Sequence, residues 1–419
     1  MAYQPVSVVG VRAWGLEVGA VAIDPSTGLG VFEYTPEWVR SGRELSPMEA
    51  PLSSRVVRGH ARSRDTFLGL PPLLADSLPD AFGNAVVDAY LTREGIDRAD
   101  FTPLDRLVYA GSRALGALEY YPAGPIDAAP SALDLSVLVS EARRAIQGDL
   151  SRESTAAVQQ LLAVGTSAGG ARAKAVIAIN ADNEVRSGSL PPEPGWRDYV
   201  LKFDGTSNDD GRSDGYTRVE YAYHLMARAA GITVAKARLL EEGDRAHFLS
   251  ERFDRWDGER RHMQSLCAMR GLDFNLTGTH DYGQYFDTIV RLDLGGDALH
   301  EAFRRAVFNV RAYNRDDHTK NVAFLMDRDG VWSLAPAYDV TFSYRADSPW
   351  VARHQMGIDG VFDDPTDEDL RRLGDRWGVP GINEALTAVD HAVADWGEFA
   401  AQAGVDAARR EAIAALISR

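Results

Sequence analysis

The hydrophobic pattern of the chain changes near Asp254, and this change restricts the folds that the chain can adopt. Before this point, short apolar runs with strand character recur, and a helical stretch from Val219 to Ala230 interrupts them before Gly231 ends it. The strand-like runs are Ala175–Ile179, Tyr199–Phe203 and His247–Ser250. After Asp254 the pattern is mostly helical. A strand-rich part followed by a helical part predicts an α+β fold with two lobes.

The helical part contains one segment of a different kind. Residues Ala323–Leu334 have a strand-turn-strand pattern, with Asp329-Gly330 at the turn. The longer helical elements after Asp254 are predicted at Ala298–Ala312, Glu368–Leu373 and Ile382–Ile417.

The front of the chain mixes strands and helices. Alternation of apolar and polar residues from Val6 to Tyr34, with glycine and proline between the runs, predicts a small β meander. Helical patterns follow at Ala81–Leu91, Asp134–Ile146 and Glu153–Leu162. Because 419 residues are too many for one ordinary core, two or three packed units are expected.

Composition excludes several classes of protein. Hydrophobic residues make up 45% and charged residues 25%, which are values typical of soluble globular proteins. No apolar run reaches eighteen residues and the N-terminus lacks the pattern of a secretory signal, so we expect a cytoplasmic location and no membrane role. The only cysteine, Cys267, cannot form an intramolecular disulfide or a cysteine-based zinc site, and it is expected to be a small buried residue. The formal net charge of −16 disfavours a broad DNA-binding surface, so any contact with nucleic acid should be mainly indirect.

The strongest chemical signal is the polar run from Asn314 to Asn321, which is followed by the strand-turn-strand segment and then by Asp339. Phosphoryl transfer needs a carboxylate that orients or deprotonates the acceptor hydroxyl, and oxygen ligands that hold Mg²⁺ on the nucleotide phosphates. In protein kinases the catalytic Asp precedes a metal-binding Asn by five positions, and Asp316 and Asn321 have this separation, whereas Asp317 misses it by one. Asp339 lies where kinases place a second metal-binding carboxylate, although Tyr338-Asp339-Val340 replaces their Asp-Phe-Gly sequence.

An isolated Asp and Asn pair at this spacing would favour a simple polar turn with helix caps. The dense polar run, the hairpin and the later aspartate together favour phosphoryl transfer instead. His318 has no second histidine at ligand spacing, so a histidine-based metal site is not indicated.

A second signal is the small-residue run Gly165–Lys174, which directly precedes an apolar strand. Small residues let backbone amides approach phosphates, and Arg172 and Lys174 add positive charge. The run matches neither the P-loop nor the usual kinase Gly-x-Gly-x-x-Gly, so by itself it is equally compatible with a flexible loop.

Two further signals lie in the strand-rich part. Lys202 stands inside an apolar strand, where a lysine is costly unless it meets an anion, as the strand lysine of kinases does; an edge-strand lysine is the alternative. Glu220 on the following helix is a candidate partner, which spacing alone cannot establish. The segment Glu251-Arg252-Phe253 ends the strand-rich part, where kinases bind adenine, but any strand end can have this pattern.

These signals follow one another in the order that a kinase requires: phosphate loop, strand lysine, hinge, and catalytic loop with its later metal carboxylate. In these motifs, and in its N-terminal region, the chain resembles the HipA family of bacterial serine/threonine kinases, the toxin components of toxin-antitoxin systems linked to growth arrest and persistence. The residues that carry the resemblance are Phe32-Glu33-Tyr34, Leu70–Phe82, Gly165–Lys174, Lys202, Glu251–Arg255, Asp316–Asn321 and Tyr338-Asp339. The resemblance covers nearly the whole chain and implies a protein-kinase-like fold with a mixed α/β N-terminal part and a mainly helical C-terminal lobe.

The resemblance also implies a role for each matching residue. Asp316 would be the catalytic base, and Asn321 and Asp339 would bind Mg²⁺. The residues expected beside ATP are Gly169, Gly170, Ala171, Arg172, Ala173, Lys174, Lys202, Glu251, Arg252, Phe253, His318, Lys320, Asn321, Tyr338 and Asp339. Three domains are expected: residues 1–125, β-rich and of HipA type; 126–255, which bind nucleotide; and 256–419, the helical catalytic lobe.

Family members autophosphorylate a serine of the glycine-rich loop, which removes that loop and stops the enzyme. Ser167 matches this serine, and Thr166 is the neighbouring alternative. About two negative charges added beside ATP phosphates disfavour nucleotide binding, so such a switch has a physical basis. The implied partners are a protein substrate such as an aminoacyl-tRNA synthetase and a small DNA-binding antitoxin of HipB type.

Two other functions remain open at this point. A small-molecule kinase of the aminoglycoside-phosphotransferase kind uses the same catalytic spacing, but it leaves Ser167 and the N-terminal region without a role. A catalytically inactive protein that binds an antitoxin and helps to repress transcription is the other alternative, and the retained Asp316, Asn321, Asp339 and Lys202 argue against it.

Overall fold

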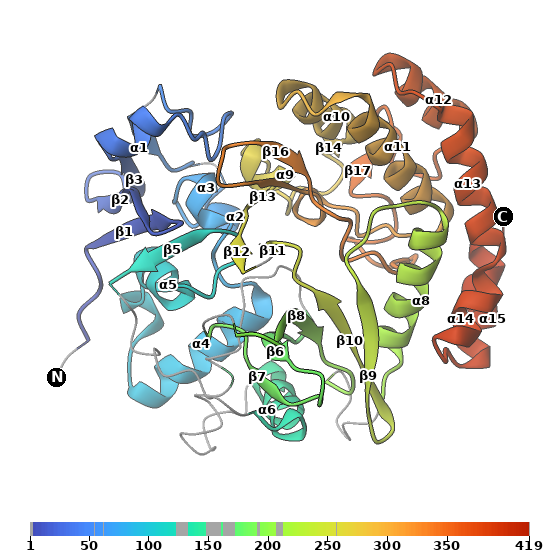
Figure 1. The fold of residues 1–419 in the computed structure, drawn as a ribbon, viewed down its shortest axis with the longest axis horizontal. Coiled ribbons are helices and arrows are strands. Elements are labelled where there is room, and N and C mark those ends of the chain that lie inside the picture. Colours follow the sequence, from blue (N-terminus) through green and yellow to red (C-terminus); the bar gives the residue numbers. More distant parts are fainter. Residues whose placement is uncertain are drawn as a thin grey trace.

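The fold is seen in a computed structural model that describes residues 3–53, 55–61, 63–122, 133–147, 161, 172–190, 193–206, 213–256 and 258–418. The predicted helix Glu153–Leu162 lies outside the described residues except for Leu161. The N-terminal sheet and the C-terminal helices lie on opposite sides of the molecule, and the second sheet lies in its lower middle part (Figure 1). This arrangement agrees with the predicted α+β fold of two lobes.

The N-terminal part is built on a five-stranded antiparallel sheet with the order β4-β3-β2-β1-β5. Its strands are β1 (Val8–Ala13), β2 (Leu16–Asp24), β3 (Leu29–Tyr34), β4 (Val56–Arg58) and β5 (Leu118–Tyr121). The first three form the predicted meander, and their alternating pattern buries one face, as Val9, Val11 and Ala13 of β1 show. The short helices of the N-terminal part are α1 (Pro36–Ser41), α2 (Arg64–Phe67), α3 (Pro72–Ala75), η1 (Arg98–Asp100) and α5 (Pro103–Ala110).

The second sheet is also antiparallel and has the order β7-β6-β8-β10-β9. Its strands are β6 (Lys174–Ile179), β7 (Val185–Ser187), β8 (Arg197–Lys202), β9 (Ala237–Glu242) and β10 (Arg245–Glu251). The three strands that the sequence predicted here are confirmed. Two helices from earlier in the chain, α4 (Ala81–Glu94) and α6 (Leu135–Gln147), share the hydrophobic core of this sheet.

Helix α8 (Tyr216–Ala229) joins the second sheet to the C-terminal lobe, because it contacts β9 and β10 as well as two C-terminal helices (Figure 1). A hairpin of β11 (Arg255–Trp256) and β12 (Glu259–Arg260) leads into that lobe. The three-stranded sheet of the lobe consists of β13 (His262–Ser265), β15 (Ala323–Met326) and β16 (Trp332–Leu334), and β15 and β16 form the predicted hairpin.

The remaining elements of this lobe are α9 (Leu266–Met269), β14 (His280–Asp281), α10 (Tyr282–Arg291), α11 (Gly295–Arg311), η3 (Thr319–Asn321), β17 (Met356–Gly357), α12 (Asp367–Arg376), α13 (Ile382–Ala394), α14 (Trp396–Gln402) and α15 (Ala407–Ile417). No helix in the described ranges is long and apolar enough to cross a membrane.

The prediction of one long helical element from Ile382 to Ile417 was wrong, because the segment forms three helices. The chain turns at Asp395 and again at Gly404, which has a φ of +71°. The first turn lets Trp396 pack edge-on against Tyr223 of α8, with ring centroids 5.3 Å apart. Burial of an indole ring against α8 therefore outweighs continuation of a helical pattern.

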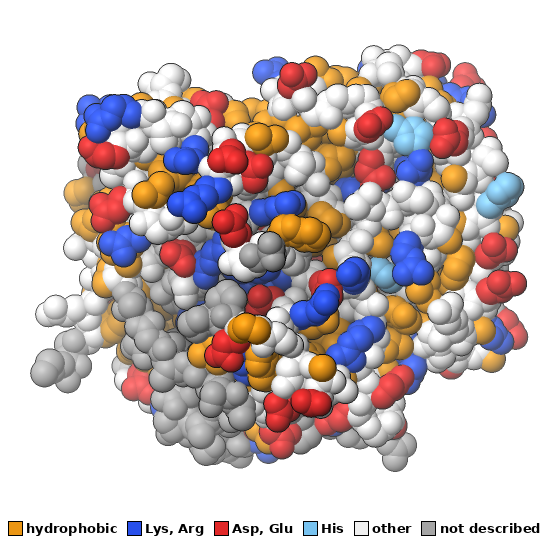
Figure 2. Space-filling model, in the orientation of Figure 1, with side chains coloured by type: hydrophobic (Ala, Val, Ile, Leu, Met, Phe, Trp, Pro, Cys, Tyr) orange, Lys and Arg blue, Asp and Glu red, His pale blue; other side chains and the backbone are white. Residues whose placement is uncertain are grey.

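Charged side chains of both signs are interspersed on the face shown in Figure 2. Among the described residues on that face no broad patch of a single sign is seen.

Candidate active site

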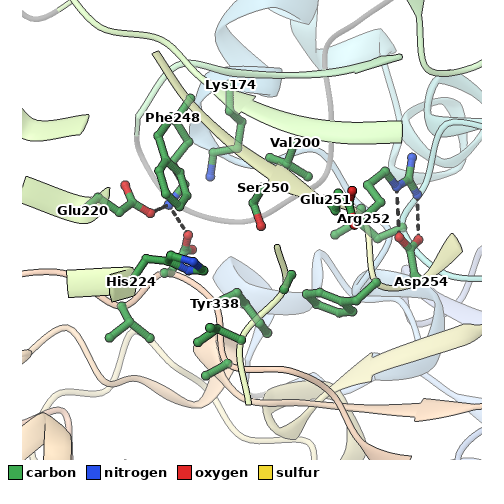
Figure 3. Close-up of a pocket in the computed structure, with 18 of the residues that line it drawn as sticks. Lys174, Val200, Glu220, His224, Phe248, Ser250, Glu251, Arg252, Asp254 and Tyr338 are labelled. Carbon is green, nitrogen blue, oxygen red and sulfur yellow. Dashed lines mark hydrogen bonds and ion pairs between the residues drawn. The ribbon is translucent and has the colours of Figure 1, made fainter. Parts of the chain in front are cut away.

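A pocket lies between the second sheet and the segment that contains Asp339 (Figure 3). Its empty volume is about 790 Å³, open solvent at the mouth included. Its walls are Leu115, Lys174, Val200, Lys202, Glu220, His224, Val234, Ala235, Phe248, Ser250, Glu251, Arg252, Phe253, Asp254, Met263, Ala337, Tyr338, Asp339 and Val340. Apolar walls with charged groups at the ends suit a ligand that has an apolar part and an anionic part.

Lys202, at the end of β8, forms ion pairs with Glu220 of α8 and with Asp339. The three side chains are largely buried. Burial lowers the pKa of Lys202, but Asp339 and Glu220 more than offset this effect, and the pKa rises to about 12. The lysine is therefore a fixed positive charge, and the pairing with Glu220 that spacing alone could not establish is present.

Asp339 has a backbone φ of +53°, which is uncommon for a residue other than glycine. Burial raises the pKa of its carboxyl group, but the positive charges of Lys202 and Lys174 lower it by more, so the net shift of the pKa is downward. An ionised carboxylate on an unusual backbone conformation at the pocket wall is a typical feature of a functional site.

The polar run from Asn314 to Asn321, which is the candidate catalytic loop, follows α11. Its two neighbouring aspartates differ in exposure. The side chain of Asp316 is 48% exposed, whereas Asp317 is buried. Asn321 donates a hydrogen bond from Nδ2 to the carbonyl oxygen of Asp316 at 2.8 Å, which leaves its amide oxygen as the atom that can bind a metal ion. Asn321 and Asp339 line one pocket that adjoins the larger one. Of the two aspartates, Asp316 is thus the exposed one, and the buried Asp317 lines the smaller pocket.

Lys174, the first residue of β6, forms an ion pair with Asp80, with 3.3 Å between Nζ and Oδ2. Asp80 caps the N-terminus of α4 by accepting a hydrogen bond from the Gly83 amide at 2.7 Å. The sequence analysis missed Asp80, because its position before a helix indicates only a cap. A residue from the front of the chain thus fixes a charged group in the pocket.

The other end of the pocket has aromatic walls. The rings of Phe253 and Tyr338 lie 5.7 Å apart, and the Tyr338 hydroxyl donates to the carbonyl oxygen of Lys320 at 2.6 Å. The guanidinium of Arg252 binds the carboxylate of Asp254 at this end, whereas Glu220 and Lys174 lie at the opposite end (Figure 3). The pocket therefore has the ring of Phe253 beside the paired Arg252 and Asp254 at one end, and the Lys202–Glu220 pair at the other.

Three predicted ligand residues contact other side chains, and of these Glu251 also lines the pocket, whereas His318 and Lys320 do not. Glu251 pairs with Arg197 at 3.0 Å, and the Lys320 ammonium group lies 5.3 Å from the centre of the Phe274 ring. His318 lies near Asp316, with 3.8 Å between Nε2 and Oδ1.

The phosphate-loop prediction is only partly visible. Arg172 lies over the ring of Tyr216 at 4.6 Å, and Ala173 is buried. Gly169, Gly170 and Ala171 lie outside the described residues, as do Thr166 and Ser167.

The sequence analysis did not single out His224, Phe248 or Ser250, which also line the pocket, because no motif marks them.

The residues present fit a nucleotide with its magnesium ion. No cluster of three or more His, Cys, Asp or Glu side chains within the described ranges is arranged to hold a metal ion. Mg²⁺ on a nucleotide needs only one or two protein ligands in addition to phosphate oxygens and water, and Asp339 and Asn321 offer such a pair.

Among the proteins similar to this chain, a curated relative and a solved structure match over most of its length. It is 28% identical to the Putative kinase Y4mE of Sinorhizobium fredii over 360 residues, which cover 81% of this chain and 78% of that protein. Its fold is similar to that of a chain in the complex of the Shewanella oneidensis toxin-antitoxin system HipA, HipB and operator DNA. The TM-score is 0.67 at 17% identity, with 98% of this chain and 94% of that chain covered.

Two family patterns match the sequence in the order expected from the motifs. Residues 9–121 match the HipA N-terminal domain, and residues 166–414 match the HipA-like C-terminal domain. The second match alone covers more than half of the chain, and the site described above lies mostly within it. This chain belongs to the HipA family.

Proposed function

We propose that this chain is an ATP-dependent serine/threonine protein kinase that requires Mg²⁺. The observation that carries the proposal is the meeting of Lys202 from the strand-rich part with Asp339 from the C-terminal lobe, beside Asn321 and the catalytic-loop candidate Asp316. The relative named as a putative kinase supports this class of activity.

Each side chain has a role that its surroundings favour. Lys202 would bind phosphate oxygens, since two carboxylates hold it protonated at the pocket wall. Asp339 and Asn321 would hold Mg²⁺, which when bound supplies positive charge against the phosphate oxygens. Asp316, half exposed beside them, would orient the substrate hydroxyl and accept its proton.

The opposite end of the pocket suits adenine. The rings of Phe253 and Tyr338 offer apolar faces, and Val200 and Met263 line the same pocket. A flat base therefore stacks at this end while the phosphates reach Lys202 at the other.

Regulation and partners follow as part of the same proposal. We propose autophosphorylation at Ser167, with Thr166 as the alternative acceptor, since either residue precedes Lys174 in the loop that would cover the phosphates. A small DNA-binding antitoxin of HipB type is the proposed partner, supported by the similarity of the fold to the HipA chain whose structure was solved with HipB and operator DNA. An aminoacyl-tRNA synthetase is the proposed class of protein substrate.

The test is phosphate transfer by the full chain with Mg-ATP. ADP release and phosphopeptide mapping by mass spectrometry are measured for the unmodified chain, for Asp316→Ala, and for Asp329→Ala as an exposed control on the nearby hairpin. We expect Asp316→Ala to lower turnover by about 10²- to 10⁴-fold with nucleotide binding retained, and Asp329→Ala to have no effect. Equal turnover in all three proteins would rule out Asp316 as the catalytic base. Phosphate on an added aminoglycoside, with none on protein, would favour the small-molecule kinase.

A further inference from the structure

The two neighbours of Asp316 are buried, and both bind the same distant segment. Arg315 and Asp317 are 4% and 3% exposed, respectively, while the side chain of Asp316 between them is 48% exposed. Alternation of this kind is what an extended backbone gives, because successive side chains point to opposite sides. The segment that they bind runs from residue 343 to 364 and follows Asp339; it is called the clamp segment below.

Arg315 is held on several sides, by the clamp segment and by the nearby Tyr313. Its guanidinium donates hydrogen bonds to the carbonyl oxygen of Ala352 and to the carboxylate of Asp364. The rings of Tyr313 and Tyr344 each lie 4.6 Å from the guanidinium carbon. Hydrogen bonds in the plane of the guanidinium and two ring contacts fix the orientation of this side chain, which a lysine could not reproduce.

Asp317 is held from a second direction. Its carboxylate accepts hydrogen bonds from Nδ1 of His354 at 2.9 Å, from the Gln355 amide at 2.8 Å and from the Tyr282 hydroxyl at 2.9 Å. His354 and Gln355 belong to the clamp segment, and His354 is 1% exposed. The buried carboxylate is therefore well satisfied, and its loss would leave several donors without an acceptor.

The backbones of the two segments are also joined. The Arg315 amide donates to the carbonyl oxygen of Ser343 at 3.1 Å, and the Ser343 amide donates to that of Tyr313 at 3.0 Å. The backbone of Asp316 is thus bounded on both sides by residues tied to the clamp segment.

We propose that Arg315 and Asp317 are positioning residues, which fix the carboxylate of Asp316 by tying its backbone to the clamp segment. The inference rests on the proposed function, because it assigns a task to the neighbours of the proposed catalytic base. A carboxylate displaced by about 1 Å costs on the order of 10²-fold in rate, so weaker clamping lowers kcat. Arg315 and its partners Ala352 and Asp364 line neither pocket of the site, so a change at this anchor should leave the affinity for nucleotide unchanged. Asp317, in contrast, lines the smaller pocket with Asn321 and Asp339.

The two neighbouring aspartates of the clamp segment provide a matched test. Asp364 binds Arg315, whereas Asp363 only approaches Arg353 at 4.0 Å, and both are largely exposed. With Mg-ATP and the full chain, we expect Asp364→Asn to lower kcat by about 10- to 100-fold, with KM for ATP within twofold. Asp363→Asn should retain full kcat, and Asp364→Glu, which keeps a carboxylate, should recover most of the activity.

Asp317→Asn tests the second anchor in the same assay, and a lower kcat is expected. Should this buried variant fail to fold, the exposed Asp364 series decides. Full kcat in Asp364→Asn would overturn the inference. An equal decrease of kcat in Asp364→Asn and Asp363→Asn would also overturn it. If Asp316→Ala itself retains full turnover, the proposed function fails, and this outcome is separate from failure of the clamp.

Discussion

Lys174 and Asp80 form a buried ion pair that connects β6 to the N-terminus of α4, with 3.3 Å between Nζ of the lysine and Oδ2 of the aspartate. Their side chains are 2% and 3% exposed. Lys174 lines the nucleotide-site candidate, so Asp80, from the front of the chain, helps to shape that site by holding this lysine.

Removal of the charge of Asp80 should destabilise the fold strongly. Asp80→Asn keeps an oxygen that can cap α4 but leaves the Lys174 ammonium group buried without a counter-charge, which costs about 3–5 kcal/mol. The measurement is the free energy of unfolding in urea. Glu37→Gln is the control, because its exposed pair with Arg40 should contribute less than about 1 kcal/mol. A loss no larger than that of the control would contradict a structural role for the buried pair.

Lys202 should be needed for nucleotide binding. Lys202→Met removes the positive charge at the pocket wall and leaves Glu220 and Asp339 to repel an incoming phosphate, so Mg-ATP should bind at least about tenfold more weakly in calorimetry. Lys236→Met, an exposed change of the same type, should leave the Kd unchanged. Equal affinity of the two variants would mean that phosphates do not meet Lys202.

Asp254 should be needed for stability at the junction between the lobes. Its carboxylate accepts hydrogen bonds from Arg252 at 2.6 Å, from Arg255 at 2.7 Å and from the Gly116 amide at 2.7 Å. Asp254→Ala leaves two arginines without their shared partner and should cost about 3–5 kcal/mol of unfolding free energy. Asp347→Ala, whose pair with Arg345 is exposed, is the control and should cost almost nothing.

The same carboxylate gives a dependence on pH. Burial raises the pKa of Asp254, but Arg252 and Arg255 lower it by more, and the net pKa lies well below the usual range. A depressed pKa in the folded state stabilises the protein above the unfolded pKa of about 3.9, and this contribution is lost as the pH falls below that value. The urea midpoint should therefore fall less steeply below about pH 4 in Asp254→Ala than in the unmodified chain.

His262 should make the protein less stable in mild acid. Burial lowers its pKa to about 4, its Nε2 donates to the Leu45 carbonyl oxygen at 2.9 Å, and its Nδ1 is buried without a partner among the described residues. The unfolded chain takes up a proton near pH 6.5 and the folded chain only near pH 4, so this contribution to stability is present above pH 6.5 and is lost as the pH falls toward 4.

Between pH 7.5 and pH 5 the expected loss from His262 is about 2 kcal/mol of unfolding free energy. His262→Gln keeps a donor for Leu45 and should reduce the difference between the two pH values by that amount. His391→Gln, an exposed control, should not reduce it. An unchanged difference in His262→Gln would show that another group is responsible.

Much of the secondary structure could be predicted because it depends on neighbours in the sequence. Alternation of apolar residues specified β1 to β3 and the strands around Lys202, and Asp329-Gly330 marked the hairpin of β15 and β16. Helix breaks without a strong local signal could not be predicted. Burial of Trp396 against Tyr223 divides the C-terminal segment, and that contact forms only in the folded chain.

For the site, the spacing of Asp316 and Asn321 and the later Asp339 pointed to the candidate residues, because catalytic loops keep fixed separations along the chain. The sequence could not show that Lys202 meets both Glu220 and Asp339, since these contacts span 18 and 137 positions. Nor could it find Asp80, whose partner lies in another region of the chain.

By itself, therefore, the sequence determined the local elements, the order of the motifs and the resemblance to the HipA family. Only the tertiary structure decided which charges are paired, and that Asp317 turns inward to His354 while Asp316 faces outward. The physical reason is the separation along the chain over which each kind of interaction acts. Backbone sterics and hydrophobic periodicity act over a few residues, whereas burial and ion pairing depend on where distant segments meet.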